Sequence, residues 1–357
     1  MTTDDPRLDL IVIFGGQSAE HDVSCTSAAH VLRAADPAKY RVTPIGITRD
    51  GRWHLADRVV QALASGPEAL PGRLDADGAV LEPTAAITPA RPGRTVVLPL
   101  LHGPMGEDGT VQGMLELADL PYVGSGVLGS AIAMDKAMAK QVAGTSGIPQ
   151  ARHVSLRADE VGPGTADSLV AELGLPVFVK PANMGSSVGV SKAKTVEAVR
   201  DALELALTYD EWVVVEEAIV GREIEVAVLG NLAPRASVPG EIIPGAEFYD
   251  YADKYVDDGS STVIPAPLTD AQVAEVQALA LRAFAALRCE ALARVDFFLE
   301  ERRGFLLNEV NTLPGFTPIS MYPKMWIASG LSYSDLIDEL VSLAIDRHRR
   351  RRRNTGR

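Results

Sequence analysis

The sequence contains few cysteines and no long apolar run. Only two of its 357 residues are cysteines, Cys25 and Cys289, and they lie far apart without metal-ligand spacing. We therefore expect both to be small buried side chains in a reducing compartment. No run of about 18 apolar residues occurs, so no membrane-spanning helix is predicted. The first predicted strand begins within ten residues of Met1 and leaves no room for a signal peptide, so we expect a cytoplasmic protein without a membrane partner.

Positive charge is scarce outside the last residues. The formal net charge is −13, which disfavours a general nucleic-acid-binding protein. The exception is the segment 347–357, which holds seven arginines and is expected to be a flexible, solubilising tail rather than a specific contact. The apolar content of 46% and the charged content of 23% are typical of globular proteins, and the length predicts two or three domains.

Strand-like and helix-like patterns alternate along the chain, which predicts an α/β fold. Residues 8–14 form a near-continuous apolar run, typical of a buried parallel strand. Residues 57–93 are rich in Gly, Pro, Ala and Asp and are expected to form a poorly defined excursion. Further strands are expected at 41–47, 95–101, 177–180, 212–216, 223–229, 293–299 and 305–311, and helices at 23–34, 134–147, 269–288 and 332–345.

The last two predicted strands form a hairpin that carries a polar cluster. Side chains alternate between the faces of a strand, so Arg294 and Asp296 share one face, as do Glu309 and Asn311. If the hairpin pairs these faces, Asp296, Glu309 and Asn311 converge as oxygen ligands for Mg²⁺, which binds through a few carboxylates plus substrate phosphates. A solvated hairpin face is the alternative. The Gly/Pro loop 312–317 directly after the cluster favours a binding site.

Three glycine-rich segments follow predicted strands or lie at their ends. Residues 15–24 join the first strand to a helix, where backbone N–H groups can bind a ligand, but they do not match the dinucleotide fingerprint. Residues 102–109 follow another buried strand. Residues 180–189 combine a lysine with two serines in a glycine loop, which suits a phosphate-covering flap. From these residues alone, a role for Glu20 in folding and a merely solvated Lys180 remain open alternatives.

Together these segments resemble the D-alanine–D-alanine ligases of the ATP-grasp superfamily. Six motifs occur in the family's order: Gly-Gly-x-Ser-x-Glu-His-x-Val-Ser, His-Gly-x-x-Gly-Glu-Asp-Gly, Met-Asp-Lys, Lys-Pro-x-x-x-Gly-Ser-Ser-Val-Gly, Phe-Tyr-Asp-Tyr-x-x-Lys-Tyr and Asn-Glu-Val-Asn-Thr-x-Pro-Gly-Phe-Thr. The resemblance implies a three-domain ATP-grasp fold whose N-terminal domain is Rossmann-like. We expect domain ranges of 1–130, 131–232 and 233–346, followed by the basic tail 347–357.

The resemblance also implies how ATP and metal ions would bind. Lys136, Lys180 and Lys254 would contact the ATP phosphates. The segment Glu216, Glu217, Ala218 and Ile219 would be the hinge strand that reads the adenine amino group, and Glu223 would hold the ribose hydroxyls. Asp296, Glu309 and Asn311 would be the ligands of two Mg²⁺ or Mn²⁺ ions. A monovalent cation such as K⁺ is a further cofactor that the family allows.

The remaining family motifs imply contacts with two D-alanine substrates. Glu20 would pair with the ammonium of the first D-alanine, and Ser186 and Tyr255 would complete a hydrogen-bonded set with it. Arg294 and the Gly315 amide would stabilise the oxyanion, and Ser320 would bind the carboxylate of the second substrate. The loop 247–260, which carries Lys254 and Tyr255, is expected to close over the site as a lid.

The expected activity is the ATP-dependent ligation of two D-alanines, through a D-alanyl phosphate, for peptidoglycan precursor synthesis. The alternatives are a ligase that accepts D-lactate or D-serine, another ATP-grasp carboxylate–amine ligase, or a non-catalytic nucleotide-binding protein. The pair Lys254–Tyr255 favours a dipeptide product, and the retained metal ligands and phosphate lysines disfavour a non-catalytic protein. The resemblance also implies a homodimer, with small-molecule substrates as its ligands.

Overall fold

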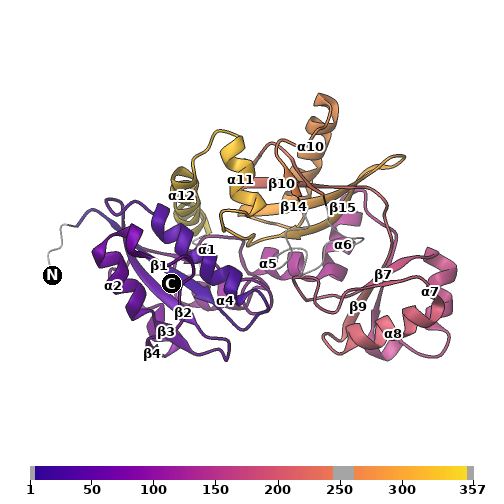
Figure 1. Cartoon of the computed structure of the whole chain (residues 1–357), viewed down its shortest axis with the longest axis horizontal. Coiled ribbons are helices and arrows are strands. Elements are labelled where there is room, and N and C mark those ends of the chain that lie inside the picture. The colour runs from indigo at the N-terminus through magenta and orange to yellow at the C-terminus, as the bar shows by residue number, and fades with distance from the viewer. Residues whose placement is uncertain (1–4, 244–260, 352–357) are drawn as a thin grey trace, which may run out of the picture.

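The structure of the chain is a computed structural model, which describes residues 5–243 and 261–351. Within this part of the chain, three separate sheets follow one another in sequence, and helices cover each of them (Figure 1). The α/β class predicted from the sequence is therefore confirmed. No helix in the described ranges is long and apolar enough to cross a membrane.

The N-terminal sheet has the order β4-β3-β2-β1-β5. Strand β1 pairs in parallel with β2 and β5, whereas β3 and β4 extend the sheet beyond β2 in antiparallel orientation. The buried apolar runs of β1 and β5 were predicted because a parallel strand is covered on both faces. The elements of this region are β1 (Leu8–Gly15), α1 (His21–Ala34), β2 (Tyr40–Ile47), β3 (Trp53–Leu55), α2 (Asp57–Ser65), β4 (Ala79–Leu81), α3 (Pro83–Ala86), β5 (Thr95–Pro99) and α4 (Thr110–Leu117).

The prediction of a poorly defined excursion at 57–93 is wrong. This segment contains α2, a short 3-10 helix at Pro67–Ala69, the edge strand β4 and α3. Leu70, Leu74 and Ala76 are buried in the same core as β1 and α1. Burial of these few apolar side chains orders a segment whose overall composition is typical of loops.

The second sheet is antiparallel, with the order β6-β9-β7-β8. It forms a lobe with α7 and α8 at the lower right of Figure 1, and apolar side chains of both helices pack on the sheet. Its elements are β6 (His153–Arg157), α7 (Thr165–Leu173), β7 (Val177–Pro181), β8 (Ser191–Ala193), α8 (Val196–Leu207) and β9 (Trp212–Glu217).

The third sheet has the order β13-β12-β10-β14-β15, and β11 pairs with β10. Alternate residues of β10 enter different cores: Val226 and Val228 face α10, and Ala227 and Leu229 face α11 and α12. Both faces of the sheet are therefore covered by helices. The elements are β10 (Arg222–Gly230), β11 (Arg235–Ala236), β12 (Gly240–Ile243), β13 (Ser261–Val263), α10 (Asp270–Ala286), β14 (Ala291–Glu300), β15 (Gly304–Asn311), α11 (Met321–Ala328) and α12 (Tyr333–Arg351).

Helix boundaries follow capping groups. The capping box of Thr269 and Gln272 begins α10 as predicted. The single helix expected at 134–147 instead begins after a break at Asp135, which separates α5 (Val127–Met134) from α6 (Lys136–Thr145). The Asp135 side chain accepts a hydrogen bond from the Met138 N–H (2.9 Å), so it caps α6.

The basic tail was predicted to begin at Arg347, but α12 continues through Arg351. Arg347 is buried, donates to the carbonyls of Gly124 and Tyr122, and stacks on the Tyr122 ring with 4.0 Å between its Cζ and the ring centroid. Arg350 and Arg351 pair with Glu290 and Glu116. Arg347, Arg350 and Arg351 therefore make specific contacts between α12 and the body of the protein, contrary to the prediction.

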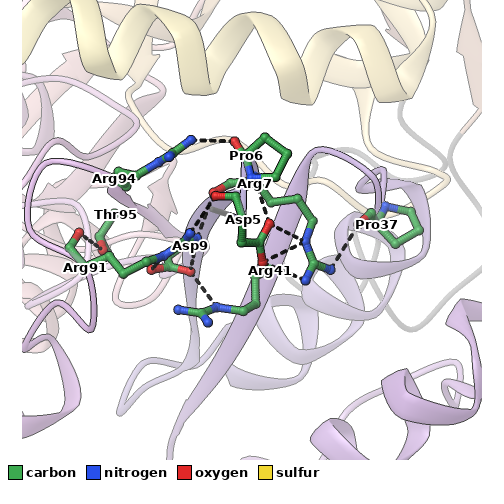
Figure 2. A network of polar contacts seen from close by, with 9 residues as sticks. All are labelled: Asp5, Pro6, Arg7, Asp9, Pro37, Arg41, Arg91, Arg94 and Thr95. Atoms are coloured by element: carbon green, nitrogen blue, oxygen red, sulfur yellow. Dashed lines mark hydrogen bonds and ion pairs between the residues drawn. The ribbon is translucent and has the colours of Figure 1, made fainter. Parts of the chain in front are cut away.

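A charged network fixes the amino ends of the parallel strands, at the edge opposite their carboxyl ends (Figure 2). Asp9, on β1, is buried and accepts from Arg41 of β2 (2.7 Å) and from Arg91 (2.8 and 2.9 Å). Arg91 also donates to the carbonyls of Asp5 and Arg7. Although burial raises the pKa of Asp9, the two guanidinium groups lower it below its ordinary value.

The expected domain boundaries stay predictions. Each region between them contains one of the three sheets, except that β10 precedes the expected boundary at 232 and pairs with β14 in the third sheet.

Candidate active site

A cavity of about 730 Å³ is lined by residues from all three sheet regions. The N-terminal region contributes the turn after β1 and the segment after β5, and the second lobe contributes β7, β9 and the loop after β7. The third sheet contributes β10, β14, β15 and the loop that leads to α11. Parallel strands direct their carboxyl ends toward a common edge, where ligands usually bind. The cavity lies at that edge of the N-terminal sheet.

Most of the predicted site residues that the structure describes line this one cavity. They are Glu20, Lys136, Lys180, Ser186, Glu216, Glu217, Ile219, Glu223, Arg294, Asp296, Glu309, Asn311, Gly315 and Ser320. Ala218 is not among the lining residues, and its N–H donates to the Pro176 carbonyl (3.0 Å). Lys254, Tyr255 and the expected lid at 247–260 lie outside the described residues. The short strand β13 follows them.

The hairpin of β14 and β15 pairs the polar faces as predicted. Asp296 lies opposite Glu309, and Arg294 lies opposite Asn311. A shift in register follows Asp296, so that Phe297 pairs with Leu307 and the polar end of the hairpin is offset from its apolar end. The Asn311 amide donates to Asp296 Oδ2 (2.9 Å). The solvated-face alternative is therefore wrong, because these side chains line a cavity and contact one another.

Arg294 supplies the positive charge of this cluster. Its guanidinium donates to both oxygens of Asp296 (2.8 and 2.7 Å), and its Nε lies 3.2 Å from Glu225 Oε1 on β10. Burial lowers the pKa of Arg294, but Asp296 and Glu225 outweigh burial and raise it well above its ordinary value. Arg294 is therefore a fixed cation held between two carboxylates.

The donor set of the hairpin suits a divalent cation. Two carboxylates and one amide oxygen on paired strands match the few protein ligands with which Mg²⁺ is held beside phosphates. No group of three His, Cys, Asp or Glu residues gathers as a metal cage in the described ranges. The protein oxygens here thus fit a metal that takes part of its coordination from a bound substrate.

A second charged group lies across the cavity, on α6, β7 and β9. The two oxygens of Glu216 pair with different lysines: Oε1 lies 3.1 Å from Lys180 Nζ, and Oε2 lies 3.2 Å from Lys140 Nζ. Burial raises the pKa of Glu216, but the two ammonium groups lower it to about 2. Lys136, at the start of α6, donates to the Met184 carbonyl (2.6 Å). Lys180 is therefore an ion-paired residue and not simply a solvated strand end.

Glu217, in the predicted hinge segment, has structural partners. Its Oε1 accepts from the Arg152 N–H (2.9 Å) and from Arg303 (2.6 Å), and its Oε2 accepts from the Arg152 Nε (2.9 Å). Arg303 lies in the turn of the β14–β15 hairpin. Glu217 thus joins the second lobe to the third sheet beside the cavity.

Glu20 lies next to the glycine-rich loop that follows β7. An ideal Cβ added at Gly185 would lie 3.6 Å from Glu20 Oε2, so the loop after β7 approaches this carboxylate closely. Ser186 has a φ of 52°, and its hydroxyl is buried without a hydrogen-bond partner among the described residues. An unsatisfied buried hydroxyl is costly, which is typical of a site that binds a ligand.

Gly315 and Ser320 lie together at the start of α11. Ser320 Oγ accepts from the Thr317 N–H (3.0 Å) and lies 2.8 Å from Thr317 Oγ1. A Cβ at Gly315 would lie only 2.8 Å from Ser320 Oγ, so a larger residue at 315 would displace this hydroxyl. The helix start also presents N–H groups that favour an anion.

The comparisons with known proteins agree with this geometry. Residues 9–125 match the family model of the D-ala D-ala ligase N-terminus, and residues 142–342 match that of the C-terminus. A D-alanine–D-alanine ligase of Oceanobacillus iheyensis is 47% identical over 349 residues, which cover 95% of each chain. This chain belongs to the D-alanine–D-alanine ligase family.

Solved structures of ATP-grasp enzymes share the fold. The D-alanine-D-alanine ligase from Coxiella burnetii has a TM-score of 0.82 at 39% identity and covers 97% of this chain and 96% of its own. The VanG D-Ala:D-Ser ligase from Enterococcus faecalis has a TM-score of 0.79 at 33% identity, covering 95% of this chain and 99% of its own. These structural matches confirm the ATP-grasp fold inferred from the motifs. The family is ATP-dependent.

The sequence analysis predicted no role for three buried charged residues. Lys140 pairs with Glu216, Glu225 pairs with Arg294, and Glu107 accepts from the Gly103 N–H (2.9 Å) inside the cavity wall. Burial first, and then the nearby Glu20 carboxylate, raise the pKa of Glu107 to about 8. Lys140 lies one helical turn after Lys136, which is the one signal that could have identified it.

Proposed function

We propose that this chain joins two D-alanine molecules into D-alanyl-D-alanine, for peptidoglycan precursors, and that ATP drives the reaction through a D-alanyl phosphate. One observation carries the proposal. A single cavity gathers lysines suited to phosphates, oxygen ligands suited to a divalent cation, and a glutamate suited to an ammonium group. The family match supports the same activity.

The first step would transfer the terminal phosphoryl group of ATP to the carboxylate of one D-alanine. Phosphoryl transfer requires mainly alignment and neutralisation of charge. Lys136 and Lys180 would provide positive charge from the cavity wall, with Lys254 as a third lysine. Two Mg²⁺ or Mn²⁺ ions held by Asp296, Glu309 and Asn311 would further neutralise the phosphates.

The nucleotide base and ribose would bind along the second lobe. In our proposal the Glu216 carboxylate and the backbone at Ala218 and Ile219 face the adenine amino group, and Glu223 faces the ribose hydroxyls. This binding mode uses the hinge between β9 and β10, where Glu217 already joins the lobe to the third sheet.

Glu20 would orient the first D-alanine by pairing with its ammonium group. Ser186 would donate its buried hydroxyl, which has no partner among the described residues, and Tyr255 would complete the set. These contacts would hold the substrate carboxylate toward the metal ligands. They would also exclude water, which would otherwise hydrolyse the acyl phosphate. The chain thereby separates binding of the amino group from activation of the carboxylate.

The second D-alanine would attack the acyl phosphate with its neutral amine. Ser320 would bind its carboxylate at the start of α11. Attack places negative charge on the former carbonyl oxygen, and preorganised donors stabilise such an oxyanion. Arg294 and the Gly315 N–H would be those donors. As the peptide C–N bond forms, the C–O bond to the phosphate would break, and the departing phosphate would take up the proton that the amine nitrogen loses.

A competition assay tests the acceptor specificity. The chain, ATP and Mg²⁺ are incubated with D-alanine alone and with equal concentrations of D-alanine and either D-lactate or D-serine, and the products are separated by chromatography. We expect mainly D-alanyl-D-alanine across roughly pH 6–9, because no titrating histidine replaces Tyr255 in the Lys254–Tyr255 pair. L-Alanine should give no product.

The incubation with D-serine tests the second candidate function, a ligase that joins D-alanine to D-serine. The similarity to the D-Ala:D-Ser ligase favours this candidate. A product that is mostly ester at pH 7, or mostly D-alanyl-D-serine, would overturn the dipeptide proposal while leaving the acyl phosphate step intact. The homodimer and the monovalent cation implied by the family stay predictions.

A further inference from the structure

Lys140 is a buried charge that the proposed reaction does not use. It is only 3% exposed, and it is not among the described residues that line the cavity, although Lys136, Lys180 and Glu216 are. Its ammonium lies 3.2 Å from Glu216 Oε2, and Glu216 is its only ion-pair partner among the described residues. Lys140 therefore stands behind the nucleotide-binding wall and contacts that wall through Glu216.

The two lysines that hold Glu216 differ in their access to the cavity. The Lys140 side chain is 4% exposed, whereas the Lys180 side chain is 15% exposed and lines the cavity. Lys180 can therefore turn toward a bound phosphate, but Lys140 has no such route. A carboxylate as buried as Glu216 requires a partner at all times, because a lone buried charge is strongly destabilising.

We propose that Lys140 is the permanent counter-ion of Glu216 and thereby allows Lys180 to exchange from Glu216 to the phosphates of ATP. The proposal rests on the proposed function, in which Lys180 contacts phosphates and Glu216 stays with the adenine. Lys140 acts through Glu216 and is a positioning residue. Without it, Lys180 would remain the sole counter-charge of Glu216 and would be withheld from the nucleotide.

The test compares ATP with adenosine, which has no phosphates, by equilibrium binding without D-alanine. For Lys140→Met, we expect ATP binding to weaken by about tenfold or more, because Lys180 must then leave a lone buried carboxylate. Adenosine binding should change by less than about threefold, since Lys180 need not move. Lys140→Arg retains the charge and should restore ATP binding to within a few-fold of wild type.

The Glu216→Gln background provides the matched control. Removing both members of a buried pair is far less costly than removing one, so Lys140→Met should have little further effect on ATP binding when Glu216 is already Gln. If Lys140→Met alone fails to fold, the double variant should fold and thereby support the pairing.

Three results would overturn the proposal. Lys140→Met could weaken the binding of ATP and of adenosine equally, or it could cause the same loss of ATP binding with Glu216 as with Gln at position 216. The third result is that the variant carrying both Lys140→Met and Glu216→Gln does not recover folding. None of these readouts involves D-alanine. Failure of the ligase assignment would instead appear as an absence of D-alanine-dependent phosphate release from the wild-type protein.

Discussion

Carboxylates on two neighbouring strands face the same cavity, and each has its own set of partners. Asp296 is neutralised by Arg294 and bonded to Asn311, whereas Glu309 lies opposite Asp296 in the register. At the level of single residues, the alternation of side chains between the faces of β14 and β15 was sufficient to predict that Asp296, Glu309 and Asn311 converge. It was not sufficient to predict Glu225, because the pairing of β10 with β14 brings together residues that are distant in sequence.

Glu309→Gln keeps the shape of the side chain but removes a negative charge from the expected metal site. We expect turnover to fall by at least about a hundredfold at saturating Mg²⁺, since charge neutralisation contributes most to phosphoryl transfer. Steady-state phosphate release measures the effect. Glu301→Gln, in the exposed turn of the same hairpin, is the control and should behave like wild type. A Glu309 variant within a few-fold of wild type would exclude the metal assignment.

Glu20→Gln should weaken the binding of the first D-alanine far more than the binding of ATP. The substituted residue cannot pair with an ammonium group, and the loss of a buried charge partner costs several kcal/mol. Initial rates at varied D-alanine and varied ATP separate the two Michaelis constants. Asp22→Asn, on an exposed side chain in the first turn of α1, which begins directly after Glu20, serves as the control. An equal rise in both constants would instead identify Glu20 as a residue required for folding.

Glu107 should make the protein less stable as the pH rises. Its folded pKa of about 8 lies above the ordinary value of 4.5, so between these values the folded state holds a proton that the unfolded state has lost. The free energy of unfolding therefore decreases across this window. Glu107→Gln should flatten the decrease, as measured by denaturant titrations from pH 5 to pH 8. A variant with an unchanged pH slope would contradict the raised pKa.

At the level of elements, α12 connects the third sheet to the N-terminal region. Arg347 is buried against the carbonyls of Gly124 and Tyr122. Composition alone favoured a solvated tail, because a run of arginines does not reveal which one meets acceptors. The same limit applies to 57–93, where loop-like composition concealed short elements ordered by a few buried side chains.

Arg347→Met should destabilise the fold, because it leaves two buried carbonyls without donors. We expect a loss of about 2 kcal/mol or more in the free energy of unfolding. Arg349→Met, at an exposed position two residues later on the same helix, should change stability by less than about 0.5 kcal/mol. Chemical denaturation of both variants measures the difference. Equal effects would show that helix content, and not the buried contact, stabilises α12.

At the level of the whole molecule, the cavity exists only because three sheets meet. The sequence predicted fourteen of the residues that line it, since glycine-rich turns and polar strand ends leave clear signals. They did not predict a role for Glu107, which lines the cavity, or for Lys140, which lies behind the lining and pairs with Glu216. A lone lysine or glutamate on a helix or loop has the same pattern as a solvated residue.

The central claim is that the chain activates a D-alanine carboxylate as an acyl phosphate. The most direct measurement uses D-alanine with ¹⁸O in its carboxylate, together with ATP and Mg²⁺, and mass analysis of the released phosphate. The mechanism predicts that each phosphate formed with a dipeptide carries one ¹⁸O from the substrate, with ADP as the other product. Unlabelled phosphate formed together with dipeptide, or AMP and pyrophosphate as products, would contradict it.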